Sequence, residues 1–297
     1  MPLSGACSQP EILPVETQHI RFVRAIASDG VPLDGIVFEP EGPAHGKILL
    51  VHGAGSHFYQ RLHQVLGATL AAAGYRVLAG NNRGHDLGAY LPNDGPEVTL
   101  GGAAWERFED AVLDLRAWVD LLATEAEVDL PLALIGHSLG AAKVAHYQAA
   151  TQDARVAALV GCSGLGFGSR LMRRPGPPEE RLAAVRQLVA SGHGDQLLDS
   201  SYQRRYISAG TYLDRIDRLR AGAPVDLARI SVPLLVVYAT GEGGTPELLA
   251  DIQAGATASP RCDTLLVADA DHDYHGQEAA VGGELISWLS EVMPGQR

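Results

Sequence analysis

Short apolar runs that alternate with helix-like stretches are the feature that most limits how this chain can fold. The runs occupy residues 47–51, 75–79, 132–135, 156–160, 232–237 and 264–268. Apolar residues at helical spacing recur between and after them, most clearly over 60–73, 105–124 and 278–292. Strands that alternate with helices form parallel sheets whose two faces are both covered. The sequence therefore predicts an α/β fold with a mostly parallel central sheet and helices on both faces.

Antiparallel strands are expected before this alternation begins. Two short alternating runs between Ile20 and Glu39 flank Ser28-Asp29-Gly30. Such a turn between alternating runs is typical of a hairpin. We therefore expect the fold to open with a pair of antiparallel strands.

An unusually long connection follows the run that ends at Val160. About seventy residues separate it from the next run, which begins at Val232, whereas most connections in compact domains are far shorter. Within it, 179–191 and 196–219 have helical spacing. We interpret 165–230 as a helical cap inserted after the sixth strand, above the C-terminal edge of the sheet, and 1–164 with 231–297 as the core. An ordinary pair of packing helices is the alternative.

The composition narrows the classes of partner. The chain has 297 residues, of which 46% are hydrophobic, and a net charge of −12, which argues against a nucleic-acid or anionic-membrane surface. Cys7, Cys162 and Cys262 are too few and scattered for a disulfide framework or a zinc site. Neither a signal-peptide pattern nor an apolar run of about 18 residues occurs. We expect a cytoplasmic protein that acts on a small molecule without contacting membranes, and the oligomeric state stays open.

One serine lies between a predicted strand and a predicted helix. The segment Gly136-His137-Ser138-Leu139-Gly140 follows the apolar run 132–135 and precedes the small-residue stretch 141–150. A sharp strand-to-helix turn strains the serine backbone and brings strand and helix together, so side chains two positions before and after the serine would clash. Glycine occupies both positions. This pattern predicts an activated nucleophile at Ser138, and an incidental serine in a Gly-rich turn is the alternative.

A serine nucleophile needs a base and a carboxylate that orients the base. His272 follows the run 264–268 in a turn-forming stretch, and loops at the C-terminal ends of strands hold the sites of open parallel sheets. His275 is the competing base. Glu242 lies at the tip of a glycine turn after the run 232–237, and is the predicted acid. The competing carboxylates are Glu247, Asp251, Asp269 and Asp271.

The negative charge that develops on a substrate carbonyl oxygen also needs preorganised donors, commonly two backbone N–H groups. His52-Gly53-Ala54-Gly55 forms a tight Gly-rich turn after the run 47–51. Leu139 follows the nucleophile and supplies an amide at a helix N-terminus. We assign the oxyanion hole to the amides of Ala54 and Leu139.

With these residues in place, the chain resembles the α/β-hydrolase family over nearly its whole length. The order Ser138, Glu242, His272 is the family order of nucleophile, acid and base. The stretch Ser28–Gly35 resembles the lead-in strands of many esterases, and Asn82-Arg83-Gly84-His85 resembles the Arg-Gly-His turn of the family. The family usually has aspartate where this chain has Glu242. The resemblance implies the α/β-hydrolase fold, with a cap at the predicted insertion.

The resemblance implies a serine hydrolase that cleaves a carboxylic ester, lactone or thioester through an acyl-enzyme, without metal or organic cofactor. An acyltransferase or carbon–carbon bond lyase with the same triad, or a catalytically silent ligand-binding protein, are the alternatives. The expected substrate contacts lie after the oxyanion turn, beside the nucleophile and in the cap: His57, Phe58, Tyr59, His137, Tyr206 and Tyr212. Phe167, Met172 and Tyr202 add to an apolar or mixed pocket.

Two further patterns lack the features of a cofactor or metal site. The glycine-rich stretch 161–168 lacks the Gly-x-Gly-x-x-Gly spacing of a dinucleotide site, because Ser169 stands where the third glycine belongs. His272 and His275 are spaced like metal ligands, but no supporting cluster accompanies them. Neither pattern predicts a cofactor or a metal.

Overall fold

The computed structural model describes residues 20–92, 98–124, 129–166, 177–199, 206–220 and 225–294. Its centre is an eight-stranded sheet with the strand order β1-β2-β4-β3-β7-β8-β11-β12. The strands are β1 (Ile20–Ile26), β2 (Pro32–Phe38), β3 (Gly46–Val51), β4 (Tyr75–Gly80), β7 (Leu132–His137), β8 (Val156–Cys162), β11 (Leu234–Ala239) and β12 (Cys262–Val267). All neighbours from β4 to β12 are parallel. The prediction of a mostly parallel sheet is confirmed.

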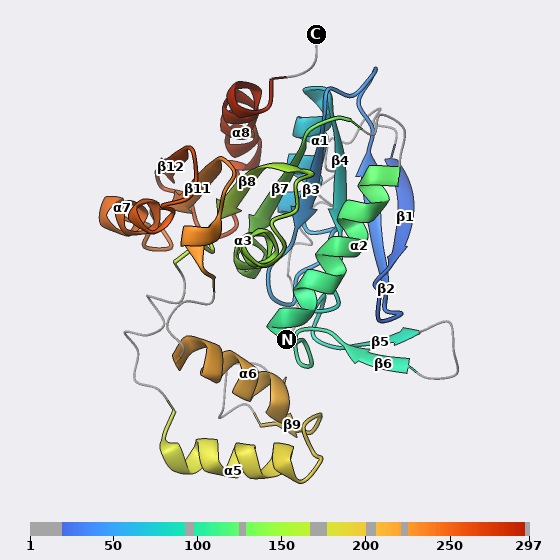
Figure 1. The fold of residues 1–297 in the computed structure, drawn as a ribbon, viewed down its shortest axis with the longest axis vertical. Helices are drawn as coiled ribbons and strands as arrows, with labels where there is room; N and C mark the ends of the chain where they lie inside the picture. Colours follow the sequence, from blue (N-terminus) through green and yellow to red (C-terminus); the bar gives the residue numbers. More distant parts are fainter. Residues whose placement is uncertain are drawn as a thin grey trace, which may run out of the picture.

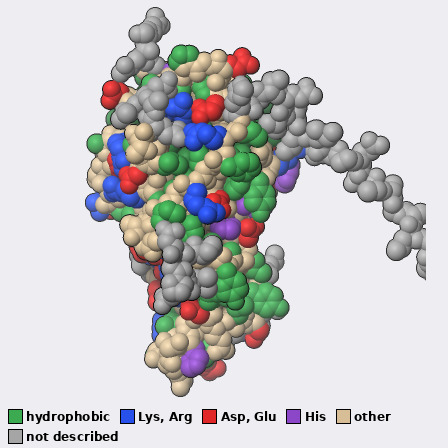
Figure 2. Space-filling view, turned by 90° about the vertical axis from the view of Figure 1, so that its right-hand side faces the viewer, with side chains coloured by type: hydrophobic (Ala, Val, Ile, Leu, Met, Phe, Trp, Pro, Cys, Tyr) green, Lys and Arg blue, Asp and Glu red, His purple; other side chains and the backbone are tan. Residues whose placement is uncertain are grey.

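The predicted antiparallel start is also present. β1 pairs with β2 and β2 with β4, both antiparallel. The β1–β2 turn is closed by a hydrogen bond from the N–H of Gly30 to the carbonyl of Ala27, and Gly30 has φ 86°, where glycine is favoured. Arg24 pairs with Asp34 directly opposite it on β2, at 2.7 Å. Basic and acidic side chains lie side by side on the face of the molecule that carries β1 and β2 (Figure 2).

Helices cover both faces of the sheet (Figure 1). One apolar cluster joins alternate strand residues such as Leu49 and Val51 to α2 (Ala111–Thr124), α3 (Leu139–Thr151) and α7 (Pro246–Gly255). The other joins Ile48 and Leu50 to α1 (Arg61–Ala72) and α8 (Glu278–Val292). The alternation of strand side chains between two covered faces explains why these strands are apolar throughout.

The helix predicted over 105–124 begins later than its spacing suggested. α2 starts at Ala111, after the 3₁₀ turn η1 (Phe108–Asp110). The N–H groups of Trp105 and Glu106 both donate to the carbonyl of Gly102, and Gly102 has φ 96°. This turn follows a short hairpin that was not predicted, formed by β5 (Ala89–Pro92) and β6 (Val98–Gly101). Residues 102–107 therefore form a turn and a short irregular segment, and the helix begins only after them.

Within the predicted cap, the structure describes α5 (Glu179–Ala190), β9 (Leu197–Leu198), β10 (Ile207–Ser208), α6 (Ala209–Arg220) and η2 (Leu227–Arg229). The prediction of a helix over 196–219 was wrong at 197–198 and 207–208, because these residues pair as strands, with Leu198 and Ile207 buried against α5 and α6. α5 and α6 pack together at the end of the molecule opposite the C-terminus (Figure 1). The domain boundaries 165 and 230 stay a prediction.

The cap segments dock on residues 104–109 through several hydrogen bonds. The N–H of Ser208 donates to the carbonyl of Ala104 at 2.7 Å, and the indole N–H of Trp105 donates to the carbonyl of Asp195 at 3.0 Å. Arg218 of α6 pairs with Glu109 at 2.6 Å. Residues 104–109, which replace the start of the predicted helix, therefore form the contact surface for the cap segments.

Candidate active site

Ser138 lies at the strained turn between β7 and α3. It has φ 55° and ψ −123°, a backbone conformation that an L-residue rarely adopts. A Cβ at Gly136 would overlap the backbone of Gly140, and a Cβ at Gly140 would overlap the carbonyl oxygen of Val51. Both glycines are therefore required by close backbone packing, as the sequence predicted.

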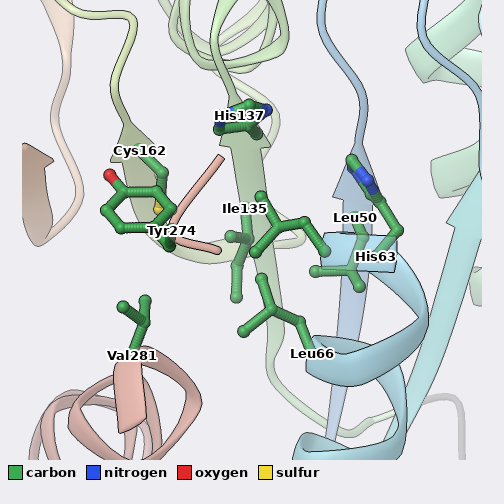
Figure 3. Close-up of a pocket in the computed structure, with 9 residues that line it drawn as sticks. Leu50, His63, Leu66, Ile135, His137, Cys162, Tyr274 and Val281 are labelled. Carbon is green, nitrogen blue, oxygen red and sulfur yellow. The ribbon is translucent and has the colours of Figure 1, made fainter. Parts of the chain in front are cut away.

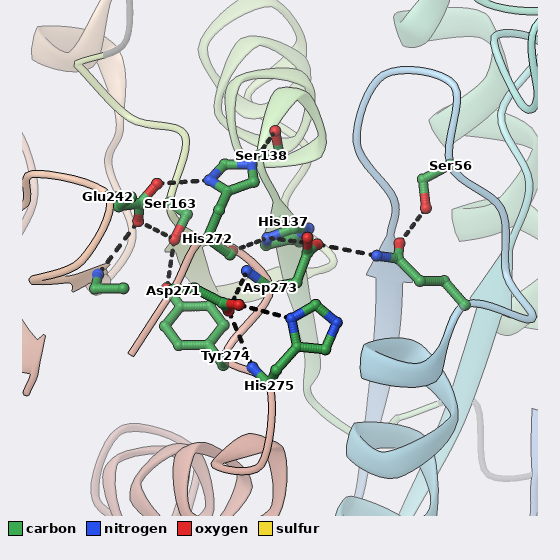
Figure 4. A network of polar contacts seen from close by, with 12 residues as sticks. Ser56, His137, Ser138, Ser163, Glu242, Asp271, His272, Asp273, Tyr274 and His275 are labelled. Carbon is green, nitrogen blue, oxygen red and sulfur yellow. Dashed lines mark hydrogen bonds and ion pairs between the residues drawn. The ribbon is translucent and has the colours of Figure 1, made fainter. Parts of the chain in front are cut away.

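The structure brings together Ser138, His272 and Glu242, the three residues predicted to form the site (Figure 4). His272 Nε2 lies 2.9 Å from Ser138 Oγ, and His272 Nδ1 lies 2.5 Å from Glu242 Oε2. A carboxylate can only accept, so Nδ1–H donates to Glu242 and Nε2 accepts the hydroxyl proton of Ser138. The hydroxyl therefore faces an unprotonated nitrogen.

Glu242 sets the protonation behaviour of His272. Its hydrogen bond raises the pKa of His272 above the ordinary value of 6.5, and this effect outweighs desolvation by burial, which lowers it. The carboxylate thus stabilises the imidazolium that would form when the serine proton is transferred. His275, the competing base, instead bonds Asp271 at 2.7 Å on the surface.

The carboxylate of Glu242 is itself held by groups that the sequence did not single out. Its Oε1 accepts from the N–H of Ala239 at 3.2 Å and from the hydroxyl of Ser163. Ser163 Oγ also lies 2.7 Å from the hydroxyl of Tyr274 (Figure 4). Ser163 belongs to the glycine-rich stretch 161–168, which lacks the spacing of a dinucleotide site but contributes this contact to Glu242.

The Gly-rich turn after β3 touches the serine. A Cβ at Gly53 would lie 2.8 Å from Ser138 Cβ and 3.2 Å from its Oγ, so only glycine fits there. The buried His52 donates from Nδ1 to the carbonyl of Gly53 at 2.8 Å and accepts at Nε2 from the N–H of Asn82 at 3.0 Å. The amides of Ala54 and Leu139 follow Gly53 and Ser138 directly. Their assignment to an oxyanion hole stays a prediction.

His137, predicted to bind substrate, is placed below the site. Its side chain is buried, and Nε2 donates to the carbonyl oxygen of His272 at 2.7 Å. Burial lowers the pKa of His137, so the ring is neutral at pH 7. His137 thus contacts the loop of His272, and its predicted contact with substrate stays a prediction.

A small cavity beneath His137 is not a substrate pocket. Its volume is about 10 Å³, which is room for about one water molecule. Apolar side chains form most of its wall, together with the rings of His63, His137 and Tyr274 (Figure 3). Within the described structure, Nδ1 of His63 and Nδ1 of His137 are buried without a hydrogen-bond partner.

An aromatic cluster follows the Gly-rich turn after β3. The rings of His57 and Tyr59 stack with centroids 3.4 Å apart, and the Tyr59 hydroxyl donates to Asp86 at 3.3 Å. Phe58 contacts Tyr59 edge-on. Tyr59 is half exposed. The predicted contact of His57, Phe58 and Tyr59 with substrate stays a prediction.

The two described cap tyrosines differ in environment. Tyr206 is exposed, whereas Tyr212 is buried in the cap interior beside Leu182 and Ile207. Tyr212 packs in the interior formed by α5 and α6, and the predicted contact of Tyr206 and Tyr212 with substrate stays a prediction. Phe167, Met172 and Tyr202 lie outside the described residues.

A buried ion pair links α3, which follows Ser138, to the segment 104–109 that contacts the cap. Lys143 of α3 is fully buried, donates to Asn82 Oδ1 at 2.8 Å and pairs with Glu106. A buried ammonium requires such partners. Sequence reasoning missed this pair, because a helical lysine is usually a surface residue.

Two kinds of feature are absent from the described residues. Among those residues, no group of three or more His, Cys, Asp or Glu side chains is arranged to hold a metal ion. In the same part of the chain, no helix combines the length and the apolar character that crossing a membrane requires.

Comparison with known proteins gives a family and a set of structural neighbours. A model of the alpha/beta hydrolase family matches residues 48–282. No curated protein matches the chain. Est1E from Butyrivibrio proteoclasticus superimposes with a TM-score of 0.65 at 16% identity, covering 91% of this chain and 98% of its own.

Two other solved structures are similar. A dienelactone hydrolase from Anabaena variabilis has a TM-score of 0.57 at 15% identity, covering 93% of this chain and 99% of its own. The Pyrococcus furiosus esterase Pf2001 has a TM-score of 0.59 at 17% identity, covering 96% of this chain and 98% of its own. At these identities the likeness concerns the fold.

Proposed function

This chain is a member of the alpha/beta hydrolase family, and we propose that it is a serine hydrolase that cleaves a carboxylic ester, lactone or thioester of a small organic substrate. The observation that carries the proposal is the hydrogen-bonded series Ser138–His272–Glu242 at a strained strand-to-helix turn. A serine hydroxyl is a weak nucleophile unless a base accepts its proton and a third group orients that base. The series supplies both.

In the proposed reaction, Ser138 Oγ attacks the substrate carbonyl carbon while its proton passes to His272 Nε2. The imidazolium is stabilised by Glu242, and the developing oxyanion by the amides of Ala54 and Leu139. His272 then gives the proton to the leaving oxygen or sulfur as the tetrahedral intermediate collapses to an acyl-enzyme. A water molecule, deprotonated by His272, releases the acid and restores the serine.

The surroundings of the three residues support this role. His52 and His137 are buried and neutral, and each bonds a backbone carbonyl next to the site. They hold the oxyanion turn and the His272 loop, the two backbone segments that the chemistry needs fixed. Among the structural neighbours, Est1E is described with ferulic acid bound and another is a dienelactone hydrolase. These descriptions favour carboxylic esters and lactones as the first substrates to test.

Labelling with a fluorophosphonate tests the proposal. The reagent phosphonylates activated serines, so the parent is expected to be labelled, and Ser138→Ala is expected to be unlabelled and at least about ten-thousandfold slower on p-nitrophenyl acetate. Ser231→Ala is the matched control, because Ser231 is exposed and bonds Gln152 away from the site. Circular dichroism checks the fold of each variant.

Two results would overturn the proposal. One is a Ser138→Ala variant that is labelled and hydrolyses the ester like the parent. The other is a folded parent that neither reacts with small fluorophosphonates nor hydrolyses p-nitrophenyl esters, lactones or thioesters, which would favour a silent ligand-binding role.

A further inference from the structure

Ser163 occupies a strained and fully enclosed position just after β8. It has φ 56° and is 1% exposed, and its N–H donates to the carbonyl of Val237 at 2.8 Å. A non-glycine residue rarely adopts this conformation and costs free energy when it does. Neighbouring Gly164 packs so closely on Ser138 that a Cβ there would overlap the serine carbonyl. The turn is thus fixed against the backbone of the proposed nucleophile.

The hydroxyl of Ser163 lies between two buried polar groups. On one side it contacts Oε1 of Glu242, and on the other side the hydroxyl of Tyr274 at 2.7 Å. A serine hydroxyl has a single proton, and a carboxylate can only accept. Ser163 therefore donates to Glu242, and its oxygen is free to accept from Tyr274.

Tyr274 is suited to be the donor at the end of this series: its hydroxyl has two acceptors within reach, the Ser163 oxygen at 2.7 Å and the carbonyl of Val237 at 3.4 Å, and the shorter contact is to Ser163. The side chain of Tyr274 is completely buried, and burial raises the pKa of the phenol, which keeps its proton. It also belongs to the loop that carries His272, where its N–H donates to the carbonyl of Asp271 at 3.2 Å. One loop thus carries both the proposed base and a support for the proposed acid.

Glutamate makes this support necessary. Its side chain has one more rotatable bond than that of aspartate, so more conformations compete with the one that reaches His272. Oε2 receives Nδ1–H of His272, and the donors on Oε1 decide how the carboxylate plane is turned. The N–H of Ala239 and the hydroxyl of Ser163 are two such donors.

We propose that Ser163, backed by Tyr274, is a positioning residue that fixes the Glu242 carboxylate toward His272. The inference rests on the proposed function, because it takes Glu242 as the acid of the triad. In this role Ser163 neither binds the substrate nor takes part in the proton transfer from Ser138 to His272. It acts only through Glu242.

A double-mutant cycle on purified full-length protein tests this role with p-nitrophenyl acetate. Ser163→Ala keeps the Cβ, so the backbone strain is unchanged while the donor is lost. We expect kcat to fall about tenfold to a hundredfold, the range for a hydrogen bond to a charged group, with KM changed less than about twofold. In the Glu242→Gln background the same substitution should change kcat less than about threefold, because residues that act through one another are not additive.

Tyr274→Phe provides a second variant should Ser163→Ala fail to fold. It is expected to lower kcat in the same direction, with the same loss of effect beside Glu242→Gln. Tyr147→Phe is the control, because it also removes a buried hydroxyl from a carboxylate, that of Asp153 at 2.6 Å, outside the site. Its kcat should equal that of the parent.

The outcomes separate the two proposals. If Glu242→Gln leaves kcat unchanged, Glu242 is not the acid and the proposed function loses that residue. If Glu242→Gln is slow but Ser163→Ala and Tyr274→Phe match the parent, only the positioning role is overturned. Equal fold losses with and without the Glu242 carboxylate would reduce Ser163 to a purely structural residue.

Discussion

The contact between His272 and Glu242 decides the pH at which the site can work. His272 accepts the serine proton only when its ring is neutral. Its pKa is raised above 6.5, first by the hydrogen bond to Glu242, while burial acts in the opposite direction. The proposed activity should therefore rise with pH through a midpoint above 6.5 and then level off.

Glu242→Gln removes the charge and keeps the length of the side chain. We expect the midpoint of kcat/KM to move to lower pH, because the main cause that raises the pKa of His272 is gone. The plateau should fall by about a thousandfold to ten-thousandfold, as when other triads lose their carboxylate. Rates measured from pH 5 to 9 give both quantities. A plateau near that of the parent, or an unmoved midpoint, would contradict this expectation.

The sequence predicted Ser138, His272 and Glu242 because each lies where a local signal meets a general rule. Gly136 and Gly140 mark the strained turn, and loops at the C-terminal ends of parallel strands converge on one edge of the sheet. Ser163 lies on the same edge, but its partners Glu242 and Tyr274 are 79 and 111 positions away in the chain. A local sequence pattern cannot predict a contact between residues so far apart in the chain.

Three glycines pack closely on backbone around the β7–α3 turn. Gly136 lies near the end of β7 and Gly140 in the first turn of α3, whereas Gly164 lies in the turn after β8 and faces the carbonyl of Ser138. A methyl group at Gly164 would overlap that backbone oxygen, which cannot move without shifting α3. The two turns are therefore rigidly coupled.

Gly164→Ala is expected to destabilise the protein by about 3 kcal/mol or more, since overpacking against backbone forces a shift of whole elements. Urea unfolding followed by circular dichroism measures this. Gly283→Ala in α8 is the control, because Gly283 is exposed and a Cβ there would meet nothing within 4 Å. It should stabilise by up to about 1 kcal/mol, the helix propensity difference. Equal stabilities of the two variants would refute the coupling.

The sequence predicted the boundaries of an element well where the local apolar pattern determines them. It predicted them poorly where contacts with backbone distant in the sequence determine them. The buried strands β3 and β7 lie within two residues of their apolar runs, and β11 is displaced by two positions at both ends from the run at 232–237. The start of α2 and the strand pairing within 196–219 depend on Gly102, on hydrogen bonds to residues 104–109 and on burial of Leu198. α7 and the β5–β6 hairpin were missed for want of a clear periodic pattern.

Across the whole molecule, buried histidines tie stability to pH. His52, His63 and His137 are all buried, and burial is the first cause that lowers the pKa of each. For His63 the pKa falls from 6.5 to about 3. An unfolded chain at pH 5 binds protons that the folded chain excludes, so this stability is present above pH 6.5 and is lost as the pH falls.

His63→Leu isolates one of these groups. The leucine fits among Leu50, Leu62 and Leu66 and cannot titrate. The free energy of unfolding of the parent should fall with acid more steeply than that of the variant, by up to about 1.4 kcal/mol per pH unit. Urea unfolding at pH 5, 6 and 7.5 measures the slopes. His193→Leu, on the exposed surface of the cap, should retain the slope of the parent, and an unchanged slope in His63→Leu would contradict the account.

The hydroxyl of Ser138 and the imidazole of His272 meet across 134 positions of the chain. The loop of His272 runs directly into α8, which packs on α1 from the first half of the fold. A polypeptide still emerging from the ribosome would already contain its serine but not the partner that activates it. Under the proposed chemistry, Ser138 stays unactivated during synthesis until the His272 loop and α8 have been made and have packed on the earlier elements, so the onset of activity would report that this late part of the fold has formed.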